Sequence, residues 1–320
     1  MDETTVVVTD APGHGVGPER EILGRVGATV VDASEMSDAD LATAIRGADA
    51  VLTCFRQVTA EHVMSAPDLK VVGRYGVGVD NIAVNAAAQR GIPVTNVPDY
   101  CVGEVADHAL ALIMSLTRGV CVYDRSVRSG SWELPVASPL RRTNSLVVGV
   151  VGFGRIGRNL SRKVAAVGFQ VIVCDPRLPS DQPTVDGFVL ASFDQILERA
   201  DVVTLHVPLD EGTRHLIGAA EIARMKSSAV VVNVARGPLV DEAALIDALR
   251  EHRIAGAGLD VVEVEPMATD HPFRTLPNVV VTPHVAYYSE ESIVELQERA
   301  AENVATVLSG ERSANTVNGV

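Results

Sequence analysis

Three polar segments in the second half of the chain carry side chains suited to acid–base chemistry. Each follows an apolar predicted strand, and they contain Arg236, Glu265 and His284 in turn. An arginine guanidinium is a forked donor for a carboxylate, and histidine titrates near neutral pH, where it can move a proton. A carboxylate on the second ring nitrogen orients the imidazole and favours its protonated form. Periodicity alone does not show that the three converge, and an exposed arginine is usually just solvated.

A glycine-rich turn lies upstream of these segments, at Gly152, Gly154 and Gly157. The apolar run 146–151 before it predicts a buried parallel strand, and the residues after it predict a helix that ends near Gly168. Glycines at this spacing allow a tight turn, close approach of backbone to a pyrophosphate, and close packing of helix on strand. The order of these elements predicts dinucleotide binding. The alternative is an ordinary βαβ unit with a glycine-rich turn.

The next predicted strand, 171–174, ends at Asp175. A carboxylate there can accept hydrogen bonds from the adenosine ribose and would repel a 2′-phosphate, which favours NAD over NADP. The glycine clusters at 13–17 and 76–78 do not complete the same pattern, so one nucleotide site is expected.

Beside a nicotinamide, the three polar residues would suffice for hydride transfer between NAD and a carbonyl carbon. His284 would donate the proton to the carbonyl oxygen, and Glu265 would support the histidine. Arg236 would polarise the carbonyl and hold an adjacent carboxylate. None of the other histidines has an equally good setting; His206 could border the cofactor or have a core or loop role.

Composition restricts the class of protein. The 320 residues suit two domains, and a hydrophobic share of 47% supports well-buried cores. A formal charge of −14 without an extended basic run disfavours binding to nucleic acid or to an anionic membrane. Four scattered cysteines predict neither disulfides nor a metal site. The acidic start, without a signal peptide or an apolar span of roughly 20 residues, predicts a cytoplasmic protein.

Strands and helices alternate along the chain, which predicts two doubly wound parallel sheets of the α/β class. The expected strands of the first half are 6–9, 29–31, 50–54, 71–74 and 94–95, and its helices are 18–26, 38–46, 60–64 and 82–90. Without a complete glycine pattern, this half is expected to carry the substrate. The last helix, 289–308, could return to the first sheet.

A long helix is predicted at 102–129, between the two sheets. Its apolar positions cover more than one narrow stripe, so it is expected to be central or buried by another subunit. The loop 130–143 follows and contains Trp132, the single tryptophan of the chain. We weigh two interpretations for it, a packed anchor of the loop and a contact at a subunit interface.

Together these motifs resemble those of a known family. Residues 233–242, 258–266 and 282–284, with the glycine turn and the segment 73–82, are similar to the NAD-dependent D-isomer-specific 2-hydroxyacid dehydrogenases. The resemblance implies a flavodoxin-like substrate-binding domain at 1–98 and 287–320, an inserted Rossmann NAD-binding domain at 99–286, and a catalytic cleft between them. It also implies a homodimer formed through the inserted domain.

The same resemblance assigns roles by position. It implies that Arg236, Glu265 and His284 are catalytic. The loop matching Tyr75, Gly76, Val77 and Gly78 is expected to bind the substrate carboxylate through backbone N–H groups. The alternative for those glycines is a simple turn, and the resemblance favours binding. The remaining positions are expected to border the cofactor, with Arg155 and Ile156 at the pyrophosphate, Asp175 at the ribose, Thr213 and Asp260 nearby, and Val207 and Val234 on the nicotinamide side.

The substrate is less well defined. Residues 74–81 and 284–290 look closest to the branch of the C-terminal-binding-protein corepressors, although these have a tryptophan near Tyr287. Arg56 could meet a second anionic group of the substrate or could be solvated. The expected function is interconversion of a small 2-oxo acid and its D-2-hydroxy acid. The alternative is an NAD(H)-sensing interaction protein with vestigial catalysis.

Overall fold

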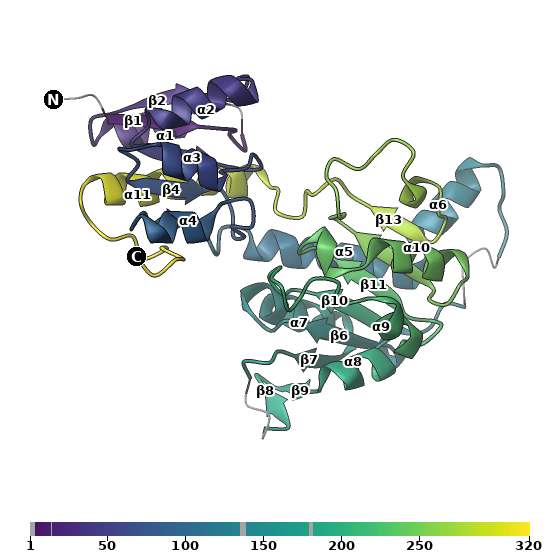
Figure 1. Ribbon diagram of the computed structural model, residues 1–320. Coiled ribbons are helices and arrows are strands. Elements are labelled where there is room, and N and C mark those ends of the chain that lie inside the picture. The colour runs from purple at the N-terminus through teal and green to yellow at the C-terminus, as the bar shows by residue number, and fades with distance from the viewer. Residues whose placement is uncertain (1–3, 14, 135–138, 179–181) are drawn as a thin grey trace. The chain divides into compact units, whose positions relative to one another are not determined.

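The structure is a computed structural model that describes residues 4–13, 15–134, 139–178 and 182–320. The chain divides into two compact units, Met1–Tyr100 with Tyr288–Val320, and Cys101–Tyr287. Both ends of the chain therefore build the first unit, as the purple, blue and yellow ribbons of Figure 1 show. The predicted domain boundaries lie within two residues of these divisions.

The first unit contains a five-stranded parallel sheet in the order β2-β1-β3-β4-β5. Valine and other β-branched residues dominate the strands, as expected for a sheet that is buried on both faces. The strands are β1 (Thr4–Val8), β2 (Ala28–Asp32), β3 (Ala50–Thr53), β4 (Val71–Arg74) and β5 (Val94–Thr95).

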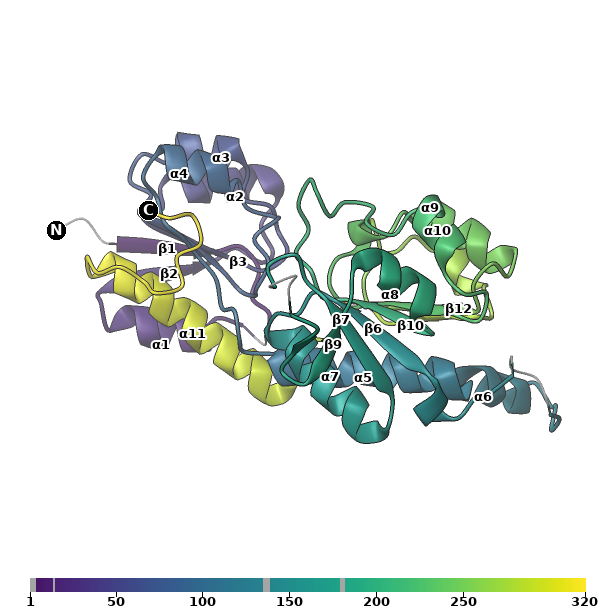
Figure 2. The ribbon, with the colours of Figure 1, turned by 90° about the horizontal axis from the view of Figure 1, so that it is seen from below.

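Helices cover both faces of this sheet. On one face lie α1 (Gly17–Gly24) and α11 (Glu290–Leu308), side by side, and on the other lie α2 (Asp38–Arg46), α3 (Ala60–Ser65) and α4 (Val84–Gln89) (Figure 2). Ser289 caps α11, because its side chain accepts the N–H of Ser292. The last helix thus returns to the first sheet and packs on β4.

The second unit contains an eight-stranded sheet in the order β13-β12-β11-β10-β6-β7-β9-β8. All pairs are parallel except β8 with β9, and the two-residue strand β8 was not predicted. The strands are β6 (Val147–Val151), β7 (Gln170–Cys174), β8 (Thr184–Val185), β9 (Phe188–Leu190), β10 (Val202–Leu205), β11 (Val230–Asn233), β12 (Gly256–Leu259) and β13 (Val279–Val281). The predicted α/β class with parallel sheets is confirmed.

Helices also cover both faces of the second sheet. One face carries α5 (Val102–Arg118) and α7 (Arg155–Val167), and the other carries α8 (Phe193–Arg199), α9 (Ala219–Arg224) and α10 (Glu242–Arg250) (Figure 2). The core under α8 to α10 is built from aliphatic side chains such as Ile196, Ile222 and Leu245. Short 3₁₀ turns lie at Thr143–Ser145, Gly237–Leu239 and Pro272–Arg274.

The predicted single helix 102–129 is wrong. It divides into α5 and α6 (Val120–Arg128), which meet at an angle of 62°. Gly119 lies between them with φ 65°, a left-handed conformation that glycine adopts without steric cost and that ends α5. Periodicity missed the break because the apolar residues continue across it.

Trp132 follows α6, and its interpretation as a packed loop anchor is also wrong, because the residue is 87% exposed. Part of the loop that was expected at 130–143, residues 135–138, lies outside the described residues. All four cysteines are free.

Within residues 4–13, 15–134, 139–178 and 182–320, no single helix is long and apolar enough to cross a membrane; the bent pair of α5 and α6 is so by length and composition only. In the same part of the chain, no group of three or more His, Cys, Asp or Glu side chains is arranged to hold a metal ion.

Candidate active site

The three predicted catalytic residues follow three neighbouring strands. β11, β12 and β13 are adjacent and parallel, so their carboxyl ends lie at one edge of the sheet. Arg236 follows β11, Glu265 follows β12 and His284 follows β13. In open α/β sheets this edge is where ligands bind.

His284 and Glu265 form a direct pair. Nδ1 of His284 lies 2.6 Å from Oε2 of Glu265, and both side chains keep some exposure, 25% and 33%. Burial disfavours the charged carboxylate, but the hydrogen bond and positive charge of His284, with the Val262 N–H and the charge of Arg236, outweigh it. The pKa of Glu265 therefore lies below its usual value. Glu265 can therefore stabilise the protonated ring of His284 by its negative charge.

Arg236 is placed by its own turn. The Asn233 side chain donates to the Arg236 carbonyl at 2.7 Å and accepts the Ala235 N–H at 3.0 Å. Gly237 comes next, and a Cβ there would lie 1.9 Å from the Val262 carbonyl oxygen. Only glycine lets this turn pack against the loop that leads to Glu265.

A buried carboxylate shapes the His284 loop. Asp260 is 1% exposed and accepts the N–H of Val285 at 3.0 Å, the N–H of Ala286 at 2.8 Å and the hydroxyl of Thr282. Its carbonyl accepts the His284 N–H at 2.7 Å. These bonds hold His284 at φ 54°, a strained value for a residue with a Cβ. Asp260, expected near the cofactor, therefore organises the loop of His284.

Sequence reasoning did not predict the roles that three residues have in this arrangement, although Asp260 was expected near the cofactor. Asn233 shapes the Arg236 turn, Asp260 fixes the His284 loop, and the Tyr287 ring meets the His284 ring edge-on, with centroids 6.1 Å apart. Asn233 and Asp260 had a usable signal, because each is the first polar residue at the end of an apolar strand. Tyr287 had none, since its contact depends on the backbone path after His284.

The glycine turn after β6 fits a pyrophosphate. Gly152 has φ 94°, and a Cβ there would lie 2.4 Å from the His206 carbonyl oxygen. A Cβ on Gly157 would lie 2.1 Å from the Gly152 carbonyl oxygen, so only glycine lets α7 approach the strand. A Cβ on Gly154 would meet nothing within 4 Å, which leaves that side open to a ligand.

The N-terminus of α7 faces this open side without a side-chain cap. Its first N–H groups have no partner within the helix and are suited to phosphate oxygens. Arg155 begins the helix as an exposed residue, and Ile156 is half-buried. Within the described ranges, no hydrogen bond or ion pair occupies the Arg155 side chain. These groups suit a dinucleotide pyrophosphate.

Asp175 follows β7 directly beside the glycine turn. Its carboxylate accepts the Phe153 N–H at 3.0 Å and three donors of Arg177, the backbone N–H, Nε and Nη2, at 2.9 to 3.0 Å. Mainly through the Arg177 side-chain hydrogen bonds, the pKa of Asp175 falls to about 2. The carboxylate stays ionised where the ribose was expected, but an exposed guanidinium, which was not predicted, offsets its charge.

The other predicted cofactor residues have mixed surroundings. A Cβ on Gly152 would also lie 2.9 Å from the Val207 side chain, so Val207 borders the glycine turn. Val234 is buried at the end of β11. The Thr213 hydroxyl donates to the Pro208 carbonyl at 2.7 Å, which closes its own turn.

His206 binds Thr204 through Nε2, and burial lowers the pKa of its ring to about 4, which keeps it neutral.

The predicted substrate loop, residues 75–78, belongs to the first unit. The Tyr75 N–H donates to the Thr53 carbonyl at 2.9 Å, and the Gly76 N–H donates to the Arg74 carbonyl at 3.1 Å. In the described part of the chain, the N–H groups of Val77 and Gly78 have no acceptor. Of the four backbone N–H groups expected to bind the substrate carboxylate, those of Val77 and Gly78 are therefore the two that can do so.

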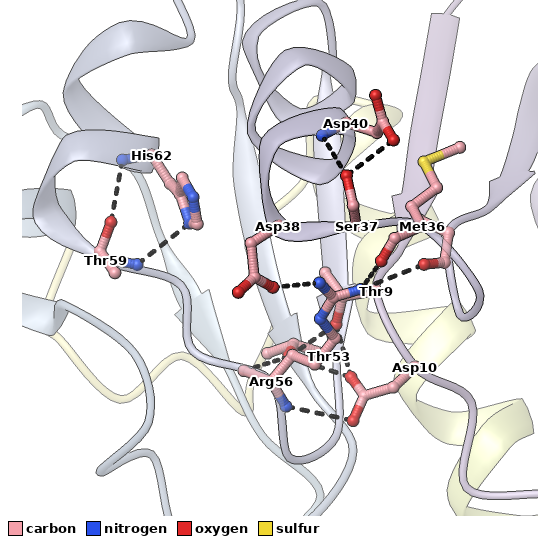
Figure 3. Close-up of polar contacts among 11 residues, drawn as sticks. Thr9, Asp10, Met36, Ser37, Asp38, Asp40, Thr53, Arg56, Thr59 and His62 are labelled. Carbon is pink, nitrogen blue, oxygen red and sulfur yellow. Dashed lines mark hydrogen bonds and ion pairs between the residues drawn. The ribbon is translucent and has the colours of Figure 1, made fainter.

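Arg56 has a structural environment. Its guanidinium donates to the carbonyls of Ala33 at 3.2 Å and Met36 at 3.1 Å and pairs with Asp38 at 2.6 Å (Figure 3). The Asp10 carboxylate accepts the N–H groups of residues 54–56 beside it. With 22% of its side chain exposed, Arg56 links two loops of the first unit and is not a freely solvated residue.

Comparison with known proteins agrees with this geometry. The model of the NAD-binding domain of the D-isomer specific 2-hydroxyacid dehydrogenases matches residues 110–286, more than half of the chain. The chain is 40% identical to a glyoxylate reductase of Korarchaeum cryptofilum over 278 residues, 86% of this chain and 84% of that protein. The chain belongs to the D-isomer-specific 2-hydroxyacid dehydrogenase family. NAD is the cofactor of the domain that it shares with this family.

Two more relatives extend the comparison. A D-3-phosphoglycerate dehydrogenase of Archaeoglobus fulgidus is 39% identical over 262 residues, 82% of this chain and 50% of that protein. The chain thus spans about half the length of that relative. The solved D-lactate dehydrogenase of Aquifex aeolicus, in complex with NAD and lactic acid, is 28% identical with a TM-score of 0.87, over 99% of this chain and all of the other. These relatives do not assign the chain to the corepressor branch.

Proposed function

We propose that the protein interconverts a small 2-oxo acid and its D-2-hydroxy acid with NAD(H). The observation that carries the proposal is the pair of His284 and Glu265, 2.6 Å apart, with the charge of Arg236 acting on the same carboxylate. Glyoxylate reductases and a D-lactate dehydrogenase among the relatives support a small substrate. The relatives show neither the branch of the family nor the exact acid, so both belong to the proposal.

Each side chain has a defined task in this reaction. The nicotinamide, when bound, supplies or accepts a hydride at the carbonyl carbon. His284 donates a proton to the carbonyl oxygen during reduction and removes it during oxidation. Glu265 accepts from Nδ1 and so keeps Nε2 as the proton-transferring atom. Arg236 binds the substrate carboxylate and polarises the carbonyl, in line with forked recognition of planar anions.

We also propose a cytoplasmic homodimer formed through the second unit. Its support is the run of exposed apolar side chains on and after α6: Val120 at 56%, Val127 at 48%, Trp132 at 87% and Leu134 at 83% exposure. Large apolar side chains exposed along one segment are costly to leave in water and are typical of interaction surfaces.

The test is an NADH-oxidation screen over 2-oxo acids of varied size and charge. We expect turnover of at least one small acid and a loss of about 100-fold or more in kcat for His284→Gln, the scale of general acid catalysis. His252→Gln is the matched control, because His252 is exposed in a turn after α10. A wild-type protein that binds NADH but reduces no acid would instead support the NAD-sensing alternative.

A further inference from the structure

A fully buried carboxylate lies in the first unit, far along the chain from the catalytic residues. Glu19, in the first turn of α1, is 0% exposed. Its partners are neutral: the Tyr75 hydroxyl donates at 2.7 Å, and the Gln297 amide donates at 3.0 and 3.2 Å to its two oxygens. In the described residues no cation pairs with Glu19. Burying a carboxylate without a cation beside it destabilises the folded state, which points to a role for Glu19.

Tyr75 and Gln297 are themselves buried and fixed. Tyr75 is 1% exposed, and Gln297 is 4% exposed and also donates to the Gly15 carbonyl at 2.9 Å. Burial, and next the negative charge of Glu19, raise the pKa of Tyr75 well above its usual value. The phenol therefore stays protonated and keeps donating to the carboxylate. The three side chains join the end of β4 to α1 and α11.

The position of Tyr75 gives this cluster a consequence outside the core. Tyr75 is the first residue after β4 and begins the loop of residues 75–78. Its ring points inward to Glu19, and its N–H donates to the Thr53 carbonyl. Val77 and Gly78 follow two and three positions later, and their N–H groups have no acceptor in the described part of the chain. Hydrogen bonds therefore hold both the hydroxyl and the backbone N–H of Tyr75, and this fixes the position at which the loop begins.

We propose that Glu19 and Gln297 are positioning residues which, through the Tyr75 phenol, hold the loop so that the N–H groups of Val77 and Gly78 can bind an anionic substrate. This rests on the proposed function, because that function makes the substrate a carboxylate. Neither Glu19 nor Gln297 touches the substrate; they act through Tyr75. Aligned N–H donors bind an anion well only when held in place beforehand.

The test uses Glu19→Gln and Tyr75→Phe in the full chain. Glu19→Gln removes the charge and presents an amide where Gln297 already donates, and Tyr75→Phe removes only the hydroxyl. For the best acid from the screen, we expect KM to rise about tenfold in both variants, as for a slightly misplaced binding group, with kcat changed much less. The NADH Kd, measured by fluorescence, should not change. Glu21→Gln, on the exposed side of the same helix, is the matched control.

Amide hydrogen exchange of residues 74–81 supplies a second readout that needs no substrate. We expect faster exchange there in both variants and wild-type exchange in Glu21→Gln. Wild-type KM and wild-type loop exchange in Tyr75→Phe would overturn the proposal, even if the variant melted at a lower temperature. A wild-type protein without activity on any 2-oxo acid would refute the proposed reaction instead, and the exchange data would still decide whether the cluster anchors the loop.

Discussion

At the scale of single residues, the proposed chemistry depends on one hydrogen bond. Glu265 holds Nδ1 of His284, and its pKa is lowered although burial opposes its charge. A group with a lowered pKa in the folded state stabilises the protein above its unfolded pKa, about 4.3, and that contribution is lost as the pH falls through the folded value. Across the neutral range the anionic partner of His284 is therefore always present.

Glu265→Gln should consequently change the pH dependence of catalysis. Without the anion the imidazolium is less favoured, so the reductive rate should begin to fall at a lower pH than in the wild type. Its kcat/KM near pH 7 should drop by about 10- to 100-fold. The measurement is kcat/KM for 2-oxo acid reduction from pH 5 to 9 at saturating NADH.

Glu263→Gln is the control for this change. Glu263 lies in the same loop, but its carboxylate pairs with His215 at 2.7 Å and not with His284. An unchanged profile is expected for it. If Glu265→Gln kept the wild-type profile, the assigned role of Glu265 would be wrong.

At the scale of elements, the site is built where turns pass each other closely. Asp260 ties the segment after β13 to the end of β12, and Gly237 lets the turn after β11 rest on the Val262 carbonyl. Arg236 and Glu265 are 29 positions apart in the sequence, and this packing of backbone on backbone makes them neighbours.

Gly237→Ala should therefore separate Arg236 from the Glu265 loop. The added Cβ would lie 1.9 Å from the Val262 oxygen and 2.6 Å from the Glu263 nitrogen, and backbone cannot yield as a flexible side chain does. We expect a loss of about 1–3 kcal/mol in the free energy of unfolding, as for overpacked sites. A loss of about 100-fold in kcat/KM should accompany it.

Denaturant unfolding and steady-state kinetics measure the two effects. Gly103→Ala, near the start of α5, is the matched control, because a Cβ there would meet nothing within 4 Å. It should be neutral or slightly stabilising, since alanine is favoured over glycine in a helix. Wild-type kinetics in Gly237→Ala would contradict the packing argument.

At the scale of the whole molecule, each unit has its own sheet and its own buried core, and the chain enters the second unit after completing five strands of the first. α11 then returns to the first sheet, so neither end of the chain can be removed without exposing that core. The segment on and after α6 carries the two most exposed of the large apolar side chains in the described residues, Trp132 and Leu134.

Replacing Trp132 and Leu134 together by serine should shift the protein toward a monomer. The two side chains are 87% and 83% exposed, so the change removes apolar surface without opening the described core. Sedimentation equilibrium over a range of concentrations measures the shift. Met64→Ser, at an exposed apolar position on α3, should leave the mass unchanged. A wild-type protein that is monomeric at every concentration would refute the dimer.

The sequence by itself determined the alternation of strands and helices, the α/β class, the glycine turn and the three polar segments. These features are local: β-branched runs, helix caps and glycine spacing act through neighbouring residues. It failed at Gly119, where one left-handed residue interrupts a continuous apolar pattern, and at Trp132, whose exposure no local pattern reveals.

Only the tertiary structure decided which polar groups meet. Packing sets the paths of the turns that bring His284 to Glu265, the His284 loop to Asp260 and the three donors of Arg177 to Asp175. Packing of helices α1 and α11 sets the Glu19–Tyr75–Gln297 cluster. Partners such as Glu19 and Gln297 are 278 positions apart. The packing of α1 on α11 brings Glu19 and Gln297 together, and strand order brings together the segments of Arg236, Glu265 and His284. Both are properties of the folded chain, which no short stretch of sequence contains.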